Sequence, residues 1–268
     1  MILWIVLIIL IALIVFLIAP SPKHHRADSW KGTLFAHRGL HGNGLTENTL
    51  EAFDAACTGG FGIELDVQLS KDGVVVVFHD DDLQRMANDN RRVDQVDFAE
   101  LQSLALNGGG RIPSFEETLR LVNGRVPLLV ELKNGRRNDE LCRKTAGLLK
   151  AYDGKTIIES FSPLIVQWWR KHEPAVVRGQ LVGAKISYLA TMGPFLAFIL
   201  SRLLLNFLGR PDFVAYDVNA AGFMAPKLQR ALFRTPLAAW TVRDAGTCLG
   251  CLERGEMPIF EGFTPEKQ

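Results

Sequence analysis

The chain has 268 residues, of which 48% are hydrophobic and 22% are charged, and its formal net charge is +1. This balance suits one or two globular domains, excludes a disordered or collagen-like chain, and gives no reason to expect nucleic acid as a partner. The four cysteines, Cys57, Cys142, Cys248 and Cys251, are too few and too scattered for a disulfide framework.

The first feature along the chain is an apolar segment from Met1 to Ala19 that contains no charged residue. A helix of this length covers about 28 Å, close to the thickness of the hydrocarbon core of a bilayer. No basic residue precedes the segment and Pro20 follows it, which favours a retained anchor over a cleaved signal peptide. The sequence therefore predicts a transmembrane anchor at 1–19 and a linker at 20–32.

The residues after this segment predict its orientation. Lys23, His24, His25 and Arg26 follow it directly, whereas the opposite flank carries no positive side chain. The positive-inside rule then predicts a single-pass protein of the cell membrane, with the folded domain on the cytoplasmic side and membrane lipid as a partner.

Short apolar runs alternate with helix-like segments over 33–268. Expected strands are 33–36, 61–67, 74–78, 127–132, 156–160, 179–182, 213–217 and 237–242, and expected helices are 48–58, 138–151, 162–172, 190–208 and 244–253. Continuous runs such as VVVVF at 74–78 are typical of strands that are buried on both faces. Eight such strands with intervening helices predict an α/β domain, most simply a (β/α)8 barrel.

The helix expected at 48–58 has a recognisable first turn. Asn48 is suited to the N-cap position, and Glu51, three residues later, completes a capping box. These two residues are therefore given a structural role.

The connection between the second and third runs is too short for a crossover helix, since it consists only of 70–73, SKDG. A turn at Asp72-Gly73 predicts a hairpin, and in one register Asp66 then lies opposite His79. A parallel barrel strand needs a tighter, extended return instead. Either geometry brings Asp66 and His79 to one end of the sheet, and the two alternatives stay open.

Polar residues gather where the expected strands end. In a barrel of this kind the active site lies at the carboxyl ends of the strands, and residues two apart on a strand share a face. The polar residues at the ends of the first four runs are His37, Arg38, Glu64, Asp66, His79, Asp80, Glu131 and Lys133, and the later runs end near Tyr216, Asp217 and Trp240.

These residue types fit one chemistry. Three converging carboxylates are costly to bury without an ion, and their oxygens suit a hard divalent cation, Ca²⁺ or Mg²⁺. Arg38 and Lys133 supply the positive charge that a phosphate requires. Imidazole side chains in general exchange protons near neutral pH, so His37 and His79 are candidates to transfer a proton in either direction. Together the residues indicate metal-assisted phosphodiester cleavage.

Each motif on its own also has a structural explanation. A Glu-x-Asp pair on a strand is often a solvated face, His79 alone can be a core histidine, and Lys133 can be an ion-pair partner at the barrel rim. Glu47 can simply favour the dipole of the following helix. Because four successive strands end in the required groups, the catalytic interpretation is favoured over the structural one.

Several motifs together resemble the glycerophosphodiester phosphodiesterase family. They are AHRG, TENT, IELDVQLSKDGVVVVFHDDDLQR, RIPSFEETL, LLVELK, SFSP and AAWTVRD, which occur over 33–244 in the order and spacing of that family. Members of the family are irregular TIM barrels that hydrolyse glycerophosphodiesters to glycerol 3-phosphate and an alcohol. The resemblance therefore implies this fold and this activity, preceded here by the N-terminal transmembrane helix.

The resemblance also implies roles for individual residues. Its metal ligands are Glu64, Asp66 and Glu131, its catalytic histidines are His37 and His79, its phosphate contacts are Arg38 and Lys133, and the expected pocket residues are Glu47 and Trp240. Two departures stand out. Thr46 replaces a frequent proline, and the C-terminal MPIFEGFTPEKQ does not clearly reproduce the usual barrel-closing motif, which leaves the boundary between the last strand and helix open.

Two other functions remain as alternatives to a membrane-anchored glycerophosphodiesterase. The same chemistry acting on a lysophospholipid would make the protein a lysophospholipase D. A catalytically silent barrel would serve as a membrane-tethered binding module, although no expected catalytic position is lost. The apolar segment 195–208 is expected to be an outer barrel helix that rests in the membrane interface, because a second span would separate strands that must be neighbours. The sequence does not indicate an oligomeric state.

Overall fold

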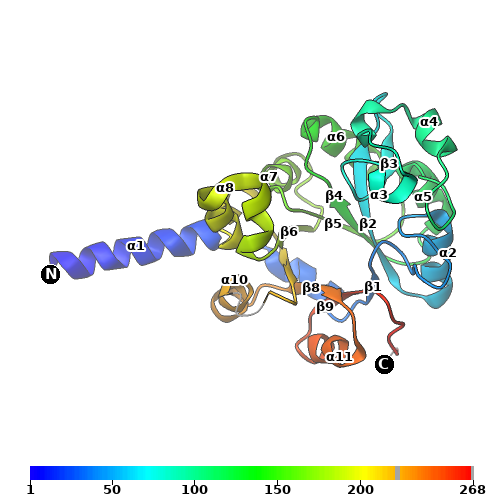
Figure 1. Cartoon of the computed structure of the whole chain (residues 1–268). Coiled ribbons are helices and arrows are strands. Elements are labelled where there is room, and N and C mark those ends of the chain that lie inside the picture. Colours follow the sequence, from blue (N-terminus) through cyan, green and yellow to red (C-terminus); the bar gives the residue numbers. More distant parts are fainter. Residues whose placement is uncertain (221–223, 267–268) are drawn as a thin grey trace.

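The computed structural model describes residues 1–220 and 224–266, and its centre is a closed ring of parallel strands (Figure 1). The ring consists of β1 (Phe35–Ala36), β2 (Gly62–Leu69), β4 (Leu128–Leu132), β5 (Thr156–Ser160), β6 (Arg178–Val182), β7 (Phe213–Asp217), β8 (Leu237–Val242) and β9 (Met257–Phe260). β1 closes it by pairing with β2 on one side and with β9 on the other. The predicted irregular TIM barrel is confirmed.

The expected third strand lies outside this ring. β3 (Val75–Val77) pairs antiparallel with β2, so the short connection is a hairpin. Val67 faces Val77, which places Phe78 opposite Asp66, and the Phe78 N–H donates to the Asp66 carbonyl at 3.0 Å. The register with His79 opposite Asp66 is therefore wrong by one residue, and the expectation of 74–78 as a barrel strand is wrong as well.

The eighth barrel strand is β9, which the sequence left unassigned. Its residues Ile259 and Phe260 pair with Phe35 and Ala36 of β1, and its other edge pairs with β8 across a register shift. β9 is only four residues long and contains Pro258, so it lacks the long apolar run that revealed the other strands. The expected strand count was right only because β9 replaces β3.

Helices cover the outside of the ring. The longer ones are α2 (Leu50–Gly59), α5 (Phe115–Val122), α6 (Asn138–Lys150), α7 (Pro163–His172), α8 (Lys185–Ser201) and α11 (Ala245–Glu253). The shorter ones are α3 (Gln84–Ala87), α4 (Phe98–Ser103), α9 (Asn206–Gly209), α10 (Met224–Leu228), η2 (Val93–Gln95) and η3 (Gln229–Phe233). The expected helix at 190–208 is two helices, α8 and α9, and α8 is itself kinked where Gly193, at φ 69°, precedes Pro194.

The first turn of α2 differs from the prediction. Its N-cap is Thr49, whose hydroxyl accepts a hydrogen bond from the Ala52 N–H. Asn48 lies outside the helix at φ 54°, a left-handed conformation that asparagine tolerates better than most residues. The capping box of Asn48 and Glu51 is therefore wrong, and the Asn48 side chain is free for another contact.

The apolar N-terminal segment forms α1 (Ile2–Ile18), which projects from one end of the domain (Figure 1). Its 17 residues rise by about 26 Å, which is less than the roughly 30 Å of a hydrocarbon core. Among the described residues, no helix combines the length and the apolar character needed to cross a membrane. The transmembrane anchor at 1–19, and with it the single-pass localisation with a cytoplasmic domain, is wrong.

Residues 20–32, expected as a linker, contain the 3₁₀-helix η1 (His24–Trp30). Ala27 is fully buried in a cluster with Phe35, Phe213 and Met257, and Trp30 stacks on Phe35 with ring centroids 6.4 Å apart. This segment therefore packs against the amino ends of the barrel strands, which leaves the carboxyl ends for a site.

Candidate active site

The barrel interior changes from apolar to charged toward the carboxyl ends of its strands. One apolar layer includes Phe35, Leu129, Ile157, Ala238 and Ile259. Side chains alternate between the two faces of a strand, so the residue two positions further on points into the same interior. Those residues are His37, Glu131, Glu159, Trp240 and Glu261, and all of them line a cavity of about 450 Å³.

Three carboxylates form an acidic cluster in this interior: Glu64 and Asp66 from β2, and Glu131 from β4. Asp66 and Glu131 are register partners on neighbouring strands, and Glu64 shares the inward face with Asp66. All three are buried, and one oxygen from each lies within 4.8 Å of the others. Burial, followed by the charges of Asp66 and Glu131, raises the pKa of Glu64 well above its ordinary value.

Two cations lie beside the acidic cluster. The Lys133 ammonium is 2.9 Å from a Glu131 oxygen and 3.3 Å from an Asp66 oxygen, and the Arg38 Nε is 3.6 Å from Asp66. Burial alone would raise the pKa of Asp66, but the positive charges around it, led by Lys133, hold that pKa below its ordinary value. Burial likewise works against the Lys133 ammonium, yet the two carboxylates raise its pKa.

The acidic cluster has the donor set of a hard divalent cation. Its ligand atoms are carboxylate oxygens only, which Ca²⁺ and Mg²⁺ prefer. Asn48 adds an amide next to it: its Nδ2 donates to Asp66 at 2.9 Å, and its buried Oδ1 has no hydrogen-bond partner among the described residues. The residues that could hold the cation are therefore Glu64, Asp66 and Glu131, with Asn48 holding Asp66 in place.

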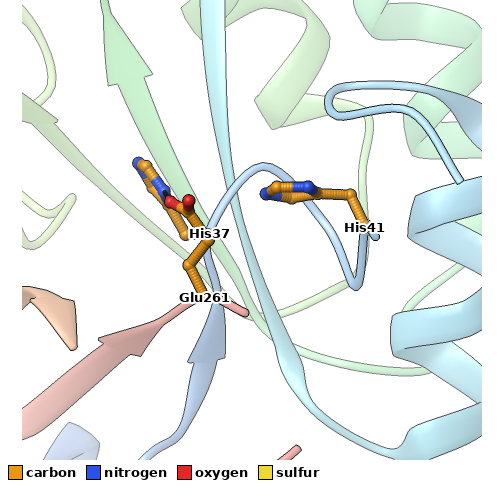
Figure 2. A group of neighbouring side chains, drawn as sticks. All are labelled: His37, His41 and Glu261. Carbon is orange, nitrogen blue, oxygen red and sulfur yellow. Dashed lines mark hydrogen bonds and ion pairs between the residues drawn. The ribbon is translucent and has the colours of Figure 1, made fainter. Parts of the chain in front are cut away.

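His37 follows β1 and is supported from the last strand of the barrel. Its backbone N–H donates to the Phe260 carbonyl at 2.9 Å, and its ring Nδ1 lies 2.6 Å from an oxygen of Glu261 (Figure 2). Its Nε2 is 3.9 Å from Glu64 and so faces the acidic cluster. The hydrogen bond from His37 lowers the pKa of Glu261 to about 2, and Arg243, 3.3 Å away, acts in the same direction.

His79 has an equivalent support on the other side of the cavity. Its Nδ1 lies 2.6 Å from an oxygen of Asp80, and the second oxygen of Asp80 accepts from the Arg85 Nε at 2.6 Å. Burial would raise the pKa of Asp80, but the hydrogen bonds from His79 and Arg85 lower it below its ordinary value.

Arg85 also connects Asp80 to Arg38, the predicted phosphate contact, through Glu47. Its two terminal nitrogens donate to Glu47 at 3.0 and 2.6 Å, and Glu47 accepts from Arg38 at 2.7 Å. Burial opposes ionisation of Glu47, but the hydrogen bond from Arg85 and the charge of Arg38 lower its pKa. Glu47 therefore orients Arg38 at the cavity edge.

The cavity also has an apolar wall. Phe161, Leu181, Trp240 and Ile259 line it, and the rings of Phe161 and Trp240 meet edge to face with centroids 5.7 Å apart. The buried Trp240 indole N–H has no hydrogen-bond partner among the described residues. A ligand here would therefore meet a charged side and an apolar side.

The structure brings most of the predicted site residues together at this cavity. His37, Arg38, Glu47, Glu64, His79, Glu131 and Trp240 line it. Asp66 and Lys133 lie directly behind this surface, joined to it through Glu131.

Four residues of the site were not singled out from the sequence. Asn48 had been assigned to a helix cap, and Arg85, in the short helix after the hairpin, ends the resemblance motif at 63–85 but was given no role. Glu159 lies opposite Glu131 in the strand register, and it could have been found by continuing the inward positions of β5. Glu261 required the assignment of β9.

Residues 37–260 match a family described as the glycerophosphoryl diester phosphodiesterase family. Among curated proteins, the chain is 35% identical to the putative glycerophosphodiester phosphodiesterase YhdW of Bacillus subtilis, over 53% of this chain and 63% of that protein. It is 36% identical to the lysophospholipase D GDPD3 of Homo sapiens, over 54% of this chain and 49% of that protein. The chain thus covers less than two thirds of either relative.

Solved structures share the fold. A phosphodiesterase of Oleispira antarctica, in complex with the product sn-glycerol-3-phosphate, superposes with a TM-score of 0.70 at 23% identity, covering 87% of this chain and 94% of that one. A glycerophosphodiester phosphodiesterase of Thermotoga maritima gives a TM-score of 0.64 at 24% identity, covering 85% and 93%. At this identity the likeness concerns the barrel itself.

Proposed function

Because the chain belongs to the glycerophosphoryl diester phosphodiesterase family, we propose that it hydrolyses glycerophosphodiesters to glycerol 3-phosphate and an alcohol. The observation that carries the proposal is the pair of histidines, each held at Nδ1 by a carboxylate, on a cavity that also presents an acidic cluster and Arg38. The product bound to the Oleispira antarctica phosphodiesterase supports the same substrate class.

The metal in this proposal is Ca²⁺ or Mg²⁺, held by Glu64, Asp66 and Glu131. Three buried carboxylates exceed the charge that Arg38 and Lys133 supply, and this imbalance favours a cation. Bound there, the ion would offset negative charge on the phosphoryl oxygens as a Lewis acid.

The histidines divide the proton transfers between them. Glu261 and Asp80 accept from the two Nδ1 atoms, which leaves each Nε2 to exchange protons with the cavity. His37 takes a proton from the attacking water as the new P–O bond forms. His79 gives a proton to the oxygen of the alcohol as the old P–O bond breaks.

Arg38 binds the phosphoryl group in this proposal, since Glu47 fixes its guanidinium at the cavity edge. Lys133 is the second phosphate contact, and its ammonium also offsets the acidic cluster. Trp240 and the rest of the apolar wall then contact the alcohol part of the substrate.

The test is release of glycerol 3-phosphate from glycerophosphoethanolamine by the full chain, before and after exhaustive chelation. We expect chelation to abolish turnover, Ca²⁺ or Mg²⁺ to restore it, and Glu131→Gln to require a higher concentration of the ion. Full activity in a demonstrably metal-free preparation would overturn the metal dependence, and absence of turnover with either ion would overturn the proposed reaction.

The apolar wall favours a second candidate function, cleavage of lysophospholipids as a lysophospholipase D. The wall gives an acyl chain a surface to contact, and the similarity to human GDPD3 supports this direction. Release of ethanolamine, measured with glycerophosphoethanolamine and with lysophosphatidylethanolamine, separates the two, because both substrates give this product and a higher kcat/KM for the lipid would make it the preferred substrate.

The proposal includes a membrane-surface setting, which rests on α8, α10 and η3. Their exposed apolar side chains are Leu189, Met192, Phe195, Leu196, Phe198, Met224, Leu228 and Leu232. Arg202, Lys227 and Arg230 lie among them, a mixture that suits an interface with anionic lipid head groups. Figure 1 shows α8 and α10 at the end of the domain from which α1 projects.

Flotation with vesicles of anionic lipid tests this setting. Phe198→Glu combined with Leu232→Glu should reduce binding without reducing cleavage of a soluble diester. Leu249→Glu, at an exposed apolar site on α11, is the matched control. Equal vesicle binding by both variants would contradict the assignment, and concentration-dependent dimerisation lost in the double variant would assign the surface to a second copy of the chain.

A further inference from the structure

A second group of metal-ligand side chains lies next to the acidic cluster but has a different chemistry. Among the described residues, His37, His41 and Glu261 each offer a ligand atom within 4.8 Å of the others. Figure 2 shows the His41 ring directed from the loop after β1 toward the pair formed by His37 and Glu261. These residues come from opposite sides of the junction between β1 and β9.

One ring nitrogen of His41 lacks a hydrogen-bond partner among the described residues. This atom, Nε2, is buried. Leaving a buried polar atom unpaired is costly, so binding of a group that pairs with it is favoured. His41 is also held in place, because its N–H donates to the Gly39 carbonyl at 2.9 Å and the neighbouring Leu40 N–H donates to Ala52.

The loop that carries His41 is rigid for a steric reason. Gly39 has φ 82°, and a Cβ there would lie 2.9 Å from the Phe53 ring and 3.0 Å from Ala52. The chain therefore packs tightly against α2 before it reaches His41. The imidazole is presented from a fixed backbone and not from a free surface loop.

Two imidazoles and one carboxylate are the ligands that zinc and similar transition metals prefer, whereas Ca²⁺ and Mg²⁺ prefer the all-oxygen acidic cluster. We propose that His37, His41 and Glu261 form a separate cation site that takes Zn²⁺. The side chains of His37 and Glu261 are 15% and 23% exposed, so an ion can reach them from solvent.

Occupation of this site would switch off catalysis, an inference that rests on the proposed function of His37. The cation would bind His37 at Nδ1, beside Glu261, and the single proton of the neutral ring would then lie at Nε2. With that proton at Nε2 and the Nδ1 electron pair bound to the metal, the ring would have no electron pair left to accept a proton from the attacking water. The same histidine would therefore serve either the reaction or the zinc site.

Metal binding is measured first, without substrate. The probe is Co²⁺, whose visible absorption reports its ligands, added to the untagged full chain in excess Mg²⁺ and displaced by Zn²⁺. We expect His41→Gln to weaken binding of both ions by at least about tenfold. His172→Gln, which changes an exposed histidine on α7, is the matched control and should bind like the unaltered chain.

Inhibition is measured next, with each variant compared with its own zinc-free rate. The zinc concentration that halves turnover should rise in His41→Gln by the same factor as the dissociation constant. Unchanged cobalt affinity in His41→Gln overturns the site, and zinc binding that leaves turnover unaffected overturns the inhibitory role. A chain that binds cobalt through His41 but hydrolyses no diester supports the site and rejects the proposed function instead.

Discussion

The two histidines of the candidate site rest on different kinds of structure. His37 is held by Glu261, which is 224 residues away, so this pair forms only when the first and last strands close the ring. His79 is held by its neighbour Asp80, on a hairpin outside the ring, and Arg85 fixes Asp80 from a helix five residues further on. One support depends on closure of the whole barrel, whereas the other is local.

This difference predicts how each side of the cavity responds to substitution. Arg85 links His79 through Asp80 and Glu47 to Arg38, so a change on the local side spreads to the phosphate site. On the closure side, the Glu261 side chain has one further hydrogen-bond partner among the described residues, Arg243, at 3.3 Å. We therefore expect substitutions near His37 to affect proton transfer only, and substitutions near His79 to affect both proton transfer and substrate binding.

Removing either imidazole gives the largest expected effect. His37→Ala and His79→Ala should each lower kcat for glycerophosphoethanolamine by about 10²–10⁴-fold, the usual contribution of a proton-transfer group. Circular dichroism should show an intact barrel in both variants, because the side chains are partly exposed. A variant with near-normal kcat would remove that histidine from the mechanism.

Neutralising the two supporting carboxylates gives the next largest effect. Glu261→Gln and Asp80→Asn should each lower kcat by about 10–100-fold, since each loses the anion that orients Nδ1. Only Asp80→Asn should also raise KM. Arg85 then loses its hydrogen-bond acceptor on Asp80, and Arg85 also contacts Glu47, which orients Arg38 for the phosphate. Steady-state kinetics separate the two parameters, and identical KM values in the two variants would contradict the proposed linkage.

The two supports also differ in how readily the sequence reveals them. His79 and Asp80 are adjacent in the sequence, whereas Glu261 was missed because β9, with four residues and a proline, carries no strand signal of its own. The long runs of β2 and of β4 to β8 were predictable since burial on both faces demands continuous apolar residues. The hairpin register was not, because a one-residue slip between β2 and β3 leaves the apolar pattern unchanged.

Strand periodicity predicted where the three carboxylates of the acidic cluster meet, whereas composition gave a wrong prediction for the N-terminal segment. Glu64, Asp66 and Glu131 follow from strand periodicity, which fixes the face on which each side chain lies. A transmembrane span depends instead on the length of helix that actually forms, and α1 ends at Ile18, just before Pro20. Asn48 was misread because a cap and a contact with Asp66 both use the same amide.

Substitution of the arginines that contact these carboxylates, Arg85 and Arg243, should change kcat/KM less than the substitutions above. Arg85→Gln removes one hydrogen bond to Asp80 and two to Glu47, and it should lower kcat/KM by about fivefold for each 1 kcal/mol lost. Arg243→Gln, the matched change on the His37 side, removes one long contact from a side chain that is 61% exposed and should have almost no effect. Equal losses of kcat/KM in the two variants would show that the His37 side and the His79 side depend equally on the arginine that contacts their carboxylate.

The smallest expected effect concerns stability in acid. The Glu261 pKa is about 2 in the folded chain against an ordinary value of 4.5, so its stabilising contribution is complete above pH 4.5 and is lost as the pH falls toward 2. Urea unfolding at pH 7 should therefore favour the unaltered chain over Glu261→Gln by about 1 kcal/mol, a value reduced by solvent screening of the partly exposed pair. The difference should shrink steadily below pH 4.5. Asp80→Asn should behave alike, because the pKa of Asp80 is also lowered. A Glu261→Gln difference that stays constant from pH 7 to pH 3 would mean that ionisation of Glu261 beside His37 contributes nothing to closing the barrel, and that β9 is held by its backbone pairing and its buried apolar side chains.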